Sequence, residues 1–240
     1  MDTLTVAAAS GMRSRMESLD LLANNIANAS TSGFKSDGEF HALYTSADAG
    51  PDALELPVIE KRWTDFSQGT LTATGSPLDV AISGSGFFVA RSPGGLLYTR
   101  NGGFRLSTGG LLQTQEGYPV LGSDGKPIQL DPGQTIEIGG DGAIHQGGAE
   151  VARLAVMECP DLDALSKHGN TYYSLDASAP AARPAANAQV RQSALENANG
   201  QPAQAAVRLV GVLRQFEMLQ RAMSLAASMN KQAIEEVAKV

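Results

Sequence analysis

Both ends of the chain carry apolar residues at helical spacing. Within the first 30 residues, apolar or small side chains recur in alternating steps of four and three, which is the heptad repeat of a coiled coil. The repeat comprises Thr5, Ala9, Met12, Met16, Leu19, Ala23 and Ile26. Asp2 and Thr3 are suitable N-caps, and Ser30-Thr31-Ser32-Gly33 can end the helix. The N-terminus is therefore predicted to form one amphipathic helix.

The C-terminus shows the same pattern over a longer stretch. A helix can begin at Pro202, because proline is tolerated in a first turn. Its repeat comprises Val212, Phe216, Leu219, Met223, Ala226, Asn230, Ala233 and Val237. Two helices with such narrow apolar stripes most simply pair with each other, or with copies of themselves, as a coiled coil. The alternative is that each helix packs separately on the middle of the chain.

Between the helices the pattern changes to short β-rich runs separated by turn sequences. The turns are rich in glycine, as in Asn101-Gly102-Gly103 and Gly139-Gly140-Asp141-Gly142. The runs include residues 79–82, 87–90, 96–99, 111–114, 135–138 and 151–157. This spacing predicts a largely antiparallel β-domain built from hairpins. The predicted fold class is α+β, with paired terminal helices and a central β-domain.

The change of pattern also predicts the domain boundaries. Residues 1–33 and 202–240 are expected to form a terminal-helix assembly domain, and residues 76–176 the central β-domain. Residues 34–75 are expected to be an extended connector. Residues 177–201, which include an alanine- and proline-rich run, are expected to connect back to the C-terminal helix.

Composition narrows the function classes. The chain has 240 residues, of which 42% are hydrophobic, 18% charged and only 5% aromatic, and it carries 26 glycines. Such a chain is not disordered, but it has few large core anchors and is expected to bury part of its surface against neighbouring subunits. Cys159 is the single cysteine, which excludes an intramolecular disulfide and predicts a small buried hydrophobe.

Charge argues against nucleic acid as a partner. The net charge is −7, and lysine and arginine form no cluster along the chain. Residues 1–40 carry three basic and five acidic side chains, whereas residues 191–240 carry six basic and four acidic ones, so the two ends are mildly complementary. No apolar run approaches a membrane span, and the N-terminus lacks the pattern of a cleaved secretory signal, so neither membrane insertion nor signal cleavage is expected.

The sequence contains no recognisable catalytic or metal-binding constellation. The histidines His41, His145 and His168 are isolated from one another. Gly84-Ser85-Gly86 lacks the third glycine of a dinucleotide-binding loop and leads into a predicted strand, so it is interpreted as a tight hairpin. We therefore predict that the protein is not an enzyme and has no cofactor or metal.

A polar cluster at the end of the first helix is unusual. Asn24, Asn25 and Asn28 lie together where amides disfavour helix unless they find partners. One interpretation is that the helix frays into a turn here. The other is that the amides bond across a helix–helix contact and determine its register.

These segments resemble a known family. Residues 21–35, which read LLANNIANASTSGFK, closely resemble the N-terminal signature of the bacterial flagellar rod and hook family. The middle of the chain adds GSPLDVAI, GFFV, YTRNG and GYPVLG, and the C-terminal part adds VRQSALENAN and RQFEM. The chain's length and the RQFEM run look most like proximal members of the rod, with distal members as the near alternative.

The resemblance implies an architecture and a role. Family members pair their terminal helices as an inner coiled coil, carry the β-domain outside and assemble helically into the rod of the flagellar basal body, which crosses the periplasm. The implied partners are other copies, other rod proteins and the flagellar type III export apparatus, which needs no cleaved signal. The expected assembly interface comprises Met12, Met16, Leu19, Asn24, Asn25, Ile26, Asn28, Val212, Phe216, Leu219 and Met223.

A function of another class is also considered. The central β-domain could bind cell-wall glycan outside the cytoplasm, with the helices serving only to oligomerise it. Trp63 and five tyrosines are the aromatic platforms available for stacking on sugars, which is a small number for such a protein.

Overall fold

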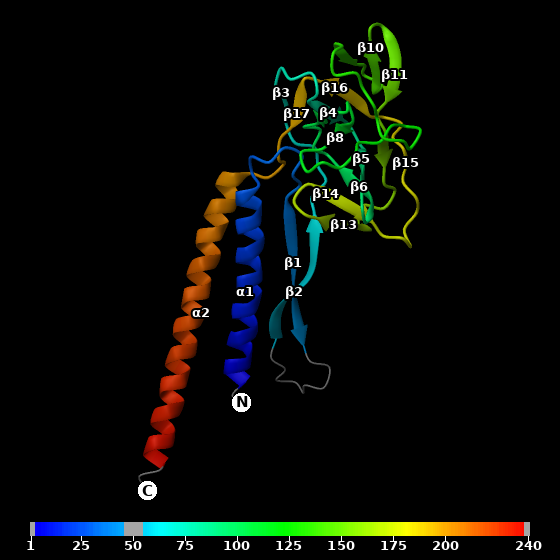
Figure 1. Ribbon diagram of the computed structural model, residues 1–240. Coiled ribbons are helices and arrows are strands. Elements are labelled where there is room, and N and C mark those ends of the chain that lie inside the picture. Colours follow the sequence, from blue (N-terminus) through cyan, green and yellow to red (C-terminus); the bar gives the residue numbers. More distant parts are fainter. Residues whose placement is uncertain (1–2, 46–54, 238–240) are drawn as a thin grey trace. The chain divides into compact units, whose positions relative to one another are not determined.

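The computed structural model describes residues 3–45 and 55–237. The chain divides into two compact units, each built from segments far apart in the sequence (Figure 1). The helical unit comprises Met1–Ala27, Asp37–Thr64 and Gln201–Val240. The β-unit comprises Asn28–Ser36 and Asp65–Gly200.

The helical unit contains the two terminal helices and a β-hairpin. Helix α1 (Thr3–Ala27) contacts helix α2 (Pro202–Val237), which confirms the predicted contact between the chain ends. Strands β1 (Asp37–Thr45) and β2 (Glu55–Thr64) pair antiparallel, and β2 contacts α1. Helix α1 therefore has neighbours of two kinds in this unit, α2 and the hairpin (Figure 1). Among the described residues, neither helix has the apolar length that a membrane span requires.

The hairpin differs from the extended connector expected over residues 34–75. Its strands pair from Asp37 with Thr64 to Thr45 with Glu55, and the register shifts once between Phe40 and His41. The rings of Phe40 and Trp63 stack with centroids 6.0 Å apart. Two features hid this hairpin in the sequence: Pro57 interrupts the second run, and the two runs are not joined by a short turn.

The β-unit contains one large sheet and several small ones. The large sheet has six strands in the order β13-β14-β6-β5-β12-β15, and its paired neighbours run antiparallel. A three-stranded sheet has the order β11-β10-β9. Two-stranded pairs are β16-β4, β17-β3 and β7-β8. The bounds are β3 (Leu71–Ala73), β4 (Val80–Ser83), β5 (Phe87–Ser92), β6 (Gly95–Thr99), β7 (Arg105–Leu106), β8 (Leu112–Gln113), β9 (Ile136–Ile138), β10 (Ala143–Gln146), β11 (Ala149–Arg153), β12 (Val156–Glu158), β13 (Leu165–His168), β14 (Tyr172–Leu175), β15 (Arg183–Pro184), β16 (Gln189–Gln192) and β17 (Ala194–Glu196). This arrangement confirms the antiparallel β region and the α+β class.

Strand β5 separates two hydrophobic cores. Because successive side chains of a strand point to opposite faces, Phe88 enters one core while Phe87 and Val89 enter the other. The first core gathers Val80, Ile82, Phe104 and Ile144 among others, and Phe88 meets Phe104 edge-on. The second contains Tyr98, Cys159 and Tyr173. The uninterrupted apolar run from Phe87 to Ala90 is thus explained by burial on both faces.

Two further segments differ from expectation. Residues 177–201 do not form a simple connector, because β15, β16 and β17 pair with β12, β4 and β3. The Gly84-Ser85-Gly86 turn is not a tight hairpin, because β4 pairs with β16 while β5 pairs with β6 and β12. Gly84 and Gly86 have φ angles of +103° and +114°, which allow the chain to pass from one sheet to another.

Cys159 is expected to resist alkylation in the folded protein. The thiol is buried, and burial, with a smaller contribution from Glu158, raises its pKa to about 11. At pH 8 we expect iodoacetamide to label native Cys159 roughly 100-fold or more slowly than the urea-unfolded chain, because only the thiolate reacts and the site is closed.

The raised pKa of the Cys159 thiol also makes the free energy of unfolding depend on pH. The folded pKa lies above the unfolded value, so the unfolded chain releases its proton first and the contribution of Cys159 to stability is lost as pH rises from 9 through 11. Between pH 8 and pH 10, the free energy of unfolding in urea should fall by about 1 kcal/mol less in Cys159→Ala than in the parent chain. An equal fall in the free energy of unfolding in the two proteins would contradict the raised pKa of Cys159.

Candidate functional site

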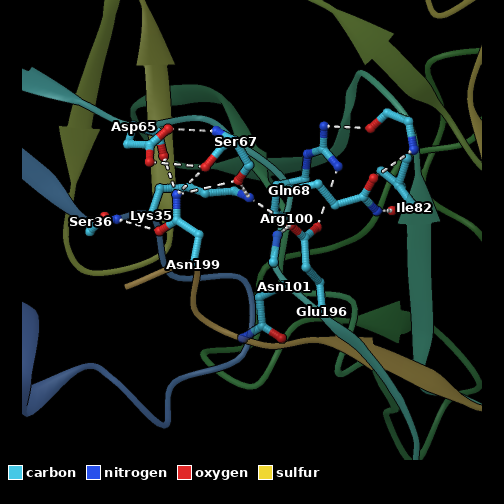
Figure 2. A network of polar contacts seen from close by, with 12 residues as sticks. Lys35, Ser36, Asp65, Ser67, Gln68, Ile82, Arg100, Asn101, Glu196 and Asn199 are labelled. Atoms are coloured by element: carbon cyan, nitrogen blue, oxygen red, sulfur yellow. Dashed lines mark hydrogen bonds and ion pairs between the residues drawn. The ribbon is translucent and has the colours of Figure 1, made fainter. Parts of the chain in front are cut away.

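Three charged side chains meet in the interior of the β-unit (Figure 2). The Nζ of Lys35 lies 2.6 Å from Oε1 of Glu196, and Nη1 of Arg100 lies 3.3 Å from Oε2 of the same carboxylate. The side chains of Lys35 and Glu196 are 0% exposed and that of Arg100 is 5% exposed. We call Lys35, Arg100 and Glu196 the ion cluster. Its burial excludes contact with a dissolved substrate, so its role is structural.

The ion cluster is also tied to the backbone on several sides. Lys35 Nζ donates to the carbonyl of Ser67 at 2.6 Å, and the amide of Gly69 donates to Glu196 Oε1 at 2.9 Å. Arg100 Nη2 donates to the carbonyl of Gly84 at 2.8 Å. The guanidinium also lies 5.3 Å from the centroid of the Phe87 ring. Segments from five parts of the chain are therefore joined at one point.

Burial dominates the electrostatics of both cations. Removal from water lowers the pKa of Lys35, and the opposing effects of Glu196 and the nearby Asp65 do not restore it. Burial likewise lowers the pKa of Arg100 although Glu196 acts against the shift. Both cations thus bear a desolvation cost that Glu196 only partly offsets.

Next to the ion cluster, Asn199 binds the segment that carries the N-terminal signature. The amide of Ser36 donates to Asn199 Oδ1 at 2.8 Å, and Asn199 Nδ2 donates to the carbonyl of Asp65 at 2.7 Å (Figure 2). The amide of Gly33 donates to the carbonyl of Glu196 at 2.7 Å. The two segments that carry the family resemblance at opposite ends of the chain are therefore bonded to each other.

Sequence reasoning missed the ion cluster as a site. Lys35 and Glu196 belong to the LLANNIANASTSGFK and VRQSALENAN segments, and Arg100 to YTRNG. The signal that could have revealed them is that each of the three motif segments contains at least one charged residue. Their pairing joins positions far apart in the sequence, so no local pattern predicts it.

On α2 the predicted stripe is the shielded face. The half-buried side chains include Val212, Phe216, Leu219, Met223 and Ala226, whereas the positions between them are exposed. Since α1 is the element with which α2 has extensive contact, this stripe faces α1. The side chains at Thr5, Asn230, Ala233 and Val237, also part of the predicted repeats, lie outside those described.

On α1 the most buried face is rotated from the predicted stripe. Met12, Leu19 and Ile26 are half-buried, but Met16 is 55% exposed and Ala23 is exposed. The buried positions of the helix are Gly11, Ser14, Ser18, Leu21 and Leu22. The reason is that α1 contacts the β1–β2 hairpin as well as α2. One such contact is the pair between Arg62 of β2 and Glu17 of α1.

The asparagines at the end of α1 bond within the chain. Asn25 exchanges two hydrogen bonds with the backbone of Asp37, at 2.8 Å and 3.0 Å, and so joins α1 to β1. Asn28 is buried and accepts from the Thr31 hydroxyl at 3.3 Å, in the turn that follows the helix. Asn24 is exposed. Within one chain, the bonds of Asn25 therefore position a strand against the helix.

The contacts described at these sites are ion pairs, hydrogen bonds and side-chain packing. Among the described residues, no three side chains of histidine, cysteine, aspartate or glutamate are placed to hold a metal ion together. His145 and His168 lie in different sheets, on β10 and β13.

Comparison with known proteins identifies the family. Residues 7–35 match the family described as flagella basal body rod protein, and residues 81–146 match the D1 domain of the flagellar hook proteins FlgE/F/G. The chain is 33% identical to the flagellar basal-body rod protein FlgF of Caulobacter vibrioides, over 100% of both chains. It is 34% identical to FlgF of Rhizobium meliloti, over 90% of both chains. It is 32% identical to the rod protein FlgG of Bacillus subtilis, over 68% of this chain and 70% of that one. The chain therefore belongs to the flagellar basal-body rod proteins, a family of structural rather than enzymatic subunits.

Proposed function

We propose that this protein is an FlgF-type subunit of the flagellar rod that assembles helically with copies of itself and with other rod proteins through its terminal helices. The observation that carries this proposal is a second apolar stripe on α2. It comprises Val207, Met218, Leu225 and Met229, which are between 60% and 74% exposed. We call these four residues the outer stripe.

The outer stripe lies opposite the face that contacts α1. Each residue turns an α-helix by about 100°, so Met218 points about 200° away from Phe216. By the same geometry Val207 and Leu225 are five turns apart and point the same way. One helix thus carries two apolar faces, and one of them has no partner within the chain's described residues.

Such a surface suits open assembly. Large exposed apolar patches on soluble proteins mark interaction sites, and a helical filament needs two different contact surfaces on each subunit. The exposed Met16 on α1 is a candidate for the complementary surface. We also propose that the interface expected from the sequence, which includes Met12, Leu19 and Phe216, organises the helix pair.

We also propose a position in the rod and an export route for this subunit. Family membership supports a place in the proximal rod, contact with adjacent rod proteins and export through the flagellar type III apparatus without a cleaved signal. The glycan-binding alternative loses support, because full-length similarity to rod proteins explains the helices and the β-domain together.

Charging the outer stripe should block assembly without unfolding the subunit. Met218→Asp combined with Leu225→Asp replaces two exposed side chains, so the monomer should keep its helix content and its urea midpoint. Buried between subunits, the same carboxylates would be costly, so rods should not form. Swim-plate motility and basal-body micrographs of cells carrying only the variant measure the outcome.

The matched control places two aspartates elsewhere on the same helix. Gln220 and Ser224 are exposed and lie outside both stripes, so Gln220→Asp with Ser224→Asp adds the same charge and should preserve motility. Normal swimming by the outer-stripe variant would contradict the proposed surface. Loss of swimming by the control would show that charge anywhere on α2 is harmful.

A further inference from the structure

The ion cluster contains more positive than negative charge. Among the described side chains, Lys35 and Arg100 are the buried cations and Glu196 is the buried carboxylate. Asp65 acts on Lys35 from a half-buried position, but its two oxygens accept hydrogen bonds from Ser67 at 2.9 Å. Nε of Arg100 has no hydrogen-bond partner. Glu196 is therefore the carboxylate that pairs with both cations, and among the described side chains it is the buried one.

Glu196 is also the last of the three residues in the chain. Lys35 and Arg100 come from the start and middle of the β-unit, whereas Glu196 ends β17, its final strand. Strands β16 and β17 pair with β4 and β3, which come from much earlier in the sequence. Asn197 and Asn199 then bond to residues 65–72. Residues 194–199 thus complete the β-unit after Lys35 and Arg100, which come earlier in the chain.

Without Glu196 the interior would be electrostatically unfavourable. A β-unit closed without residues 194–199 would bury two cations with no carboxylate between them. Leaving one partner of a buried ion pair uncompensated is strongly destabilising. A chain lacking this segment therefore favours states in which Lys35 and Arg100 remain in water.

We propose that Glu196 is an electrostatic latch that makes closure of the β-unit conditional on arrival of the segment 194–199. A chain made or transported N-terminus first stays open until this segment is present, and then the β-unit closes in one cooperative step. This closure takes place within a single chain and does not depend on the proposed assembly surfaces.

The first test uses the full chain with Glu196→Gln, which keeps the side-chain volume and an oxygen acceptor for Gly69 but removes the charge. We expect the equilibrium constant for unfolding in urea to rise roughly 100-fold or more. Native-state labelling of Cys159, the single thiol, should accelerate in parallel.

A second variant separates charge from packing. Adding Lys35→Met to Glu196→Gln removes one uncompensated cation, so the double variant should recover about tenfold or more of the lost stability. Lys35→Met alone should cost less than Glu196→Gln, because the pair of Arg100 and Glu196 remains. A double variant no more stable than Glu196→Gln would overturn the latch and leave Glu196 as an ordinary structural residue.

The order of events is tested during synthesis. Translation of the natural chain is arrested with residue 195 or residue 200 just outside the ribosome, and Cys159 is labelled briefly. We expect a reactive thiol at the first position and a protected one at the second. Glu196→Gln should remain reactive at the second position, and Lys35→Met with Glu196→Gln should regain part of the protection. Protection with residue 195 exposed would overturn the proposal.

Discussion

Replacing Leu19 and Phe216 together with aspartate should abolish rod assembly and swimming. The two side chains are half-buried on helices that contact each other, and Phe216 lies on the stripe of α2 that faces α1, so each substitution places a carboxylate on a shielded part of its helix. Burying an unpaired charge costs several kcal/mol, and like charges on facing helices add to the cost. The helix pair should therefore separate, which removes the framework that positions the outer stripe. Motility and isolated basal bodies measure the effect.

The β-unit provides the internal control for this double variant. Its two cores lie within residues 65–200, so Cys159 should stay protected from alkylation while assembly is lost. The variant with aspartates at Gln220 and Ser224 adds the same charge and should swim. Normal motility of the variant with aspartates at Leu19 and Phe216 would mean that the helix pair does not support assembly.

Gly33→Ala should be among the most destabilising single methyl additions in the protein. Gly33 has a φ of +72°, and a Cβ added there would lie 2.3 Å from the backbone nitrogen of Asn101 and 2.5 Å from the carbonyl carbon of Arg100. Backbone cannot move aside as a flexible side chain can, and Arg100 belongs to the ion cluster. We expect a loss of about 3 kcal/mol or more, a large part of a typical domain stability. Urea unfolding of the full chain measures it.

Gly75→Ala is the matched control. Gly75 has a similar φ of +78°, but nothing lies within 4 Å of an added Cβ. This variant therefore bears only the backbone strain of a left-handed alanine, about 1 kcal/mol. The difference between the two variants isolates the close approach of residues 33 and 101. Equal losses would mean that the Gly33 site relaxes and that strain alone explains its glycine.

The helices and their stripes were predictable because they are local properties. Residues three and four apart share a helix face, so the half-burial of Val212, Phe216 and Met223 follows from spacing alone once α1 is the partner. The strands at residues 87–90 and 96–99 were likewise marked by short apolar runs between glycine turns. The same logic failed on α1. Its buried face includes Ser14 and Ser18, because a second neighbour, the β1–β2 hairpin, covers a side that the repeat does not mark.

No local sequence pattern predicted the ion cluster. Lys35, Arg100 and Glu196 each look like an ordinary solvated charge in the sequence, since charged residues are rarely buried unless paired. Only the pairing of β16 and β17 with early strands brings the carboxylate to the cations. Asn25 is similar: its amide was expected to act between helices or in a fraying turn, and its partner within the chain is the backbone of β1.

The sequence by itself determined the α+β class, the two heptad-patterned terminal helices and the membership of the rod family, because these depend on periodicity and on contiguous motifs. The tertiary structure decided which face of α1 is buried, that residues 37–45 pair with residues 55–64, and that the two signature segments meet at a buried ion cluster. The physical reason is that burial and charge pairing depend on contacts between residues far apart in the chain, and local spacing carries no information about which distant segments meet.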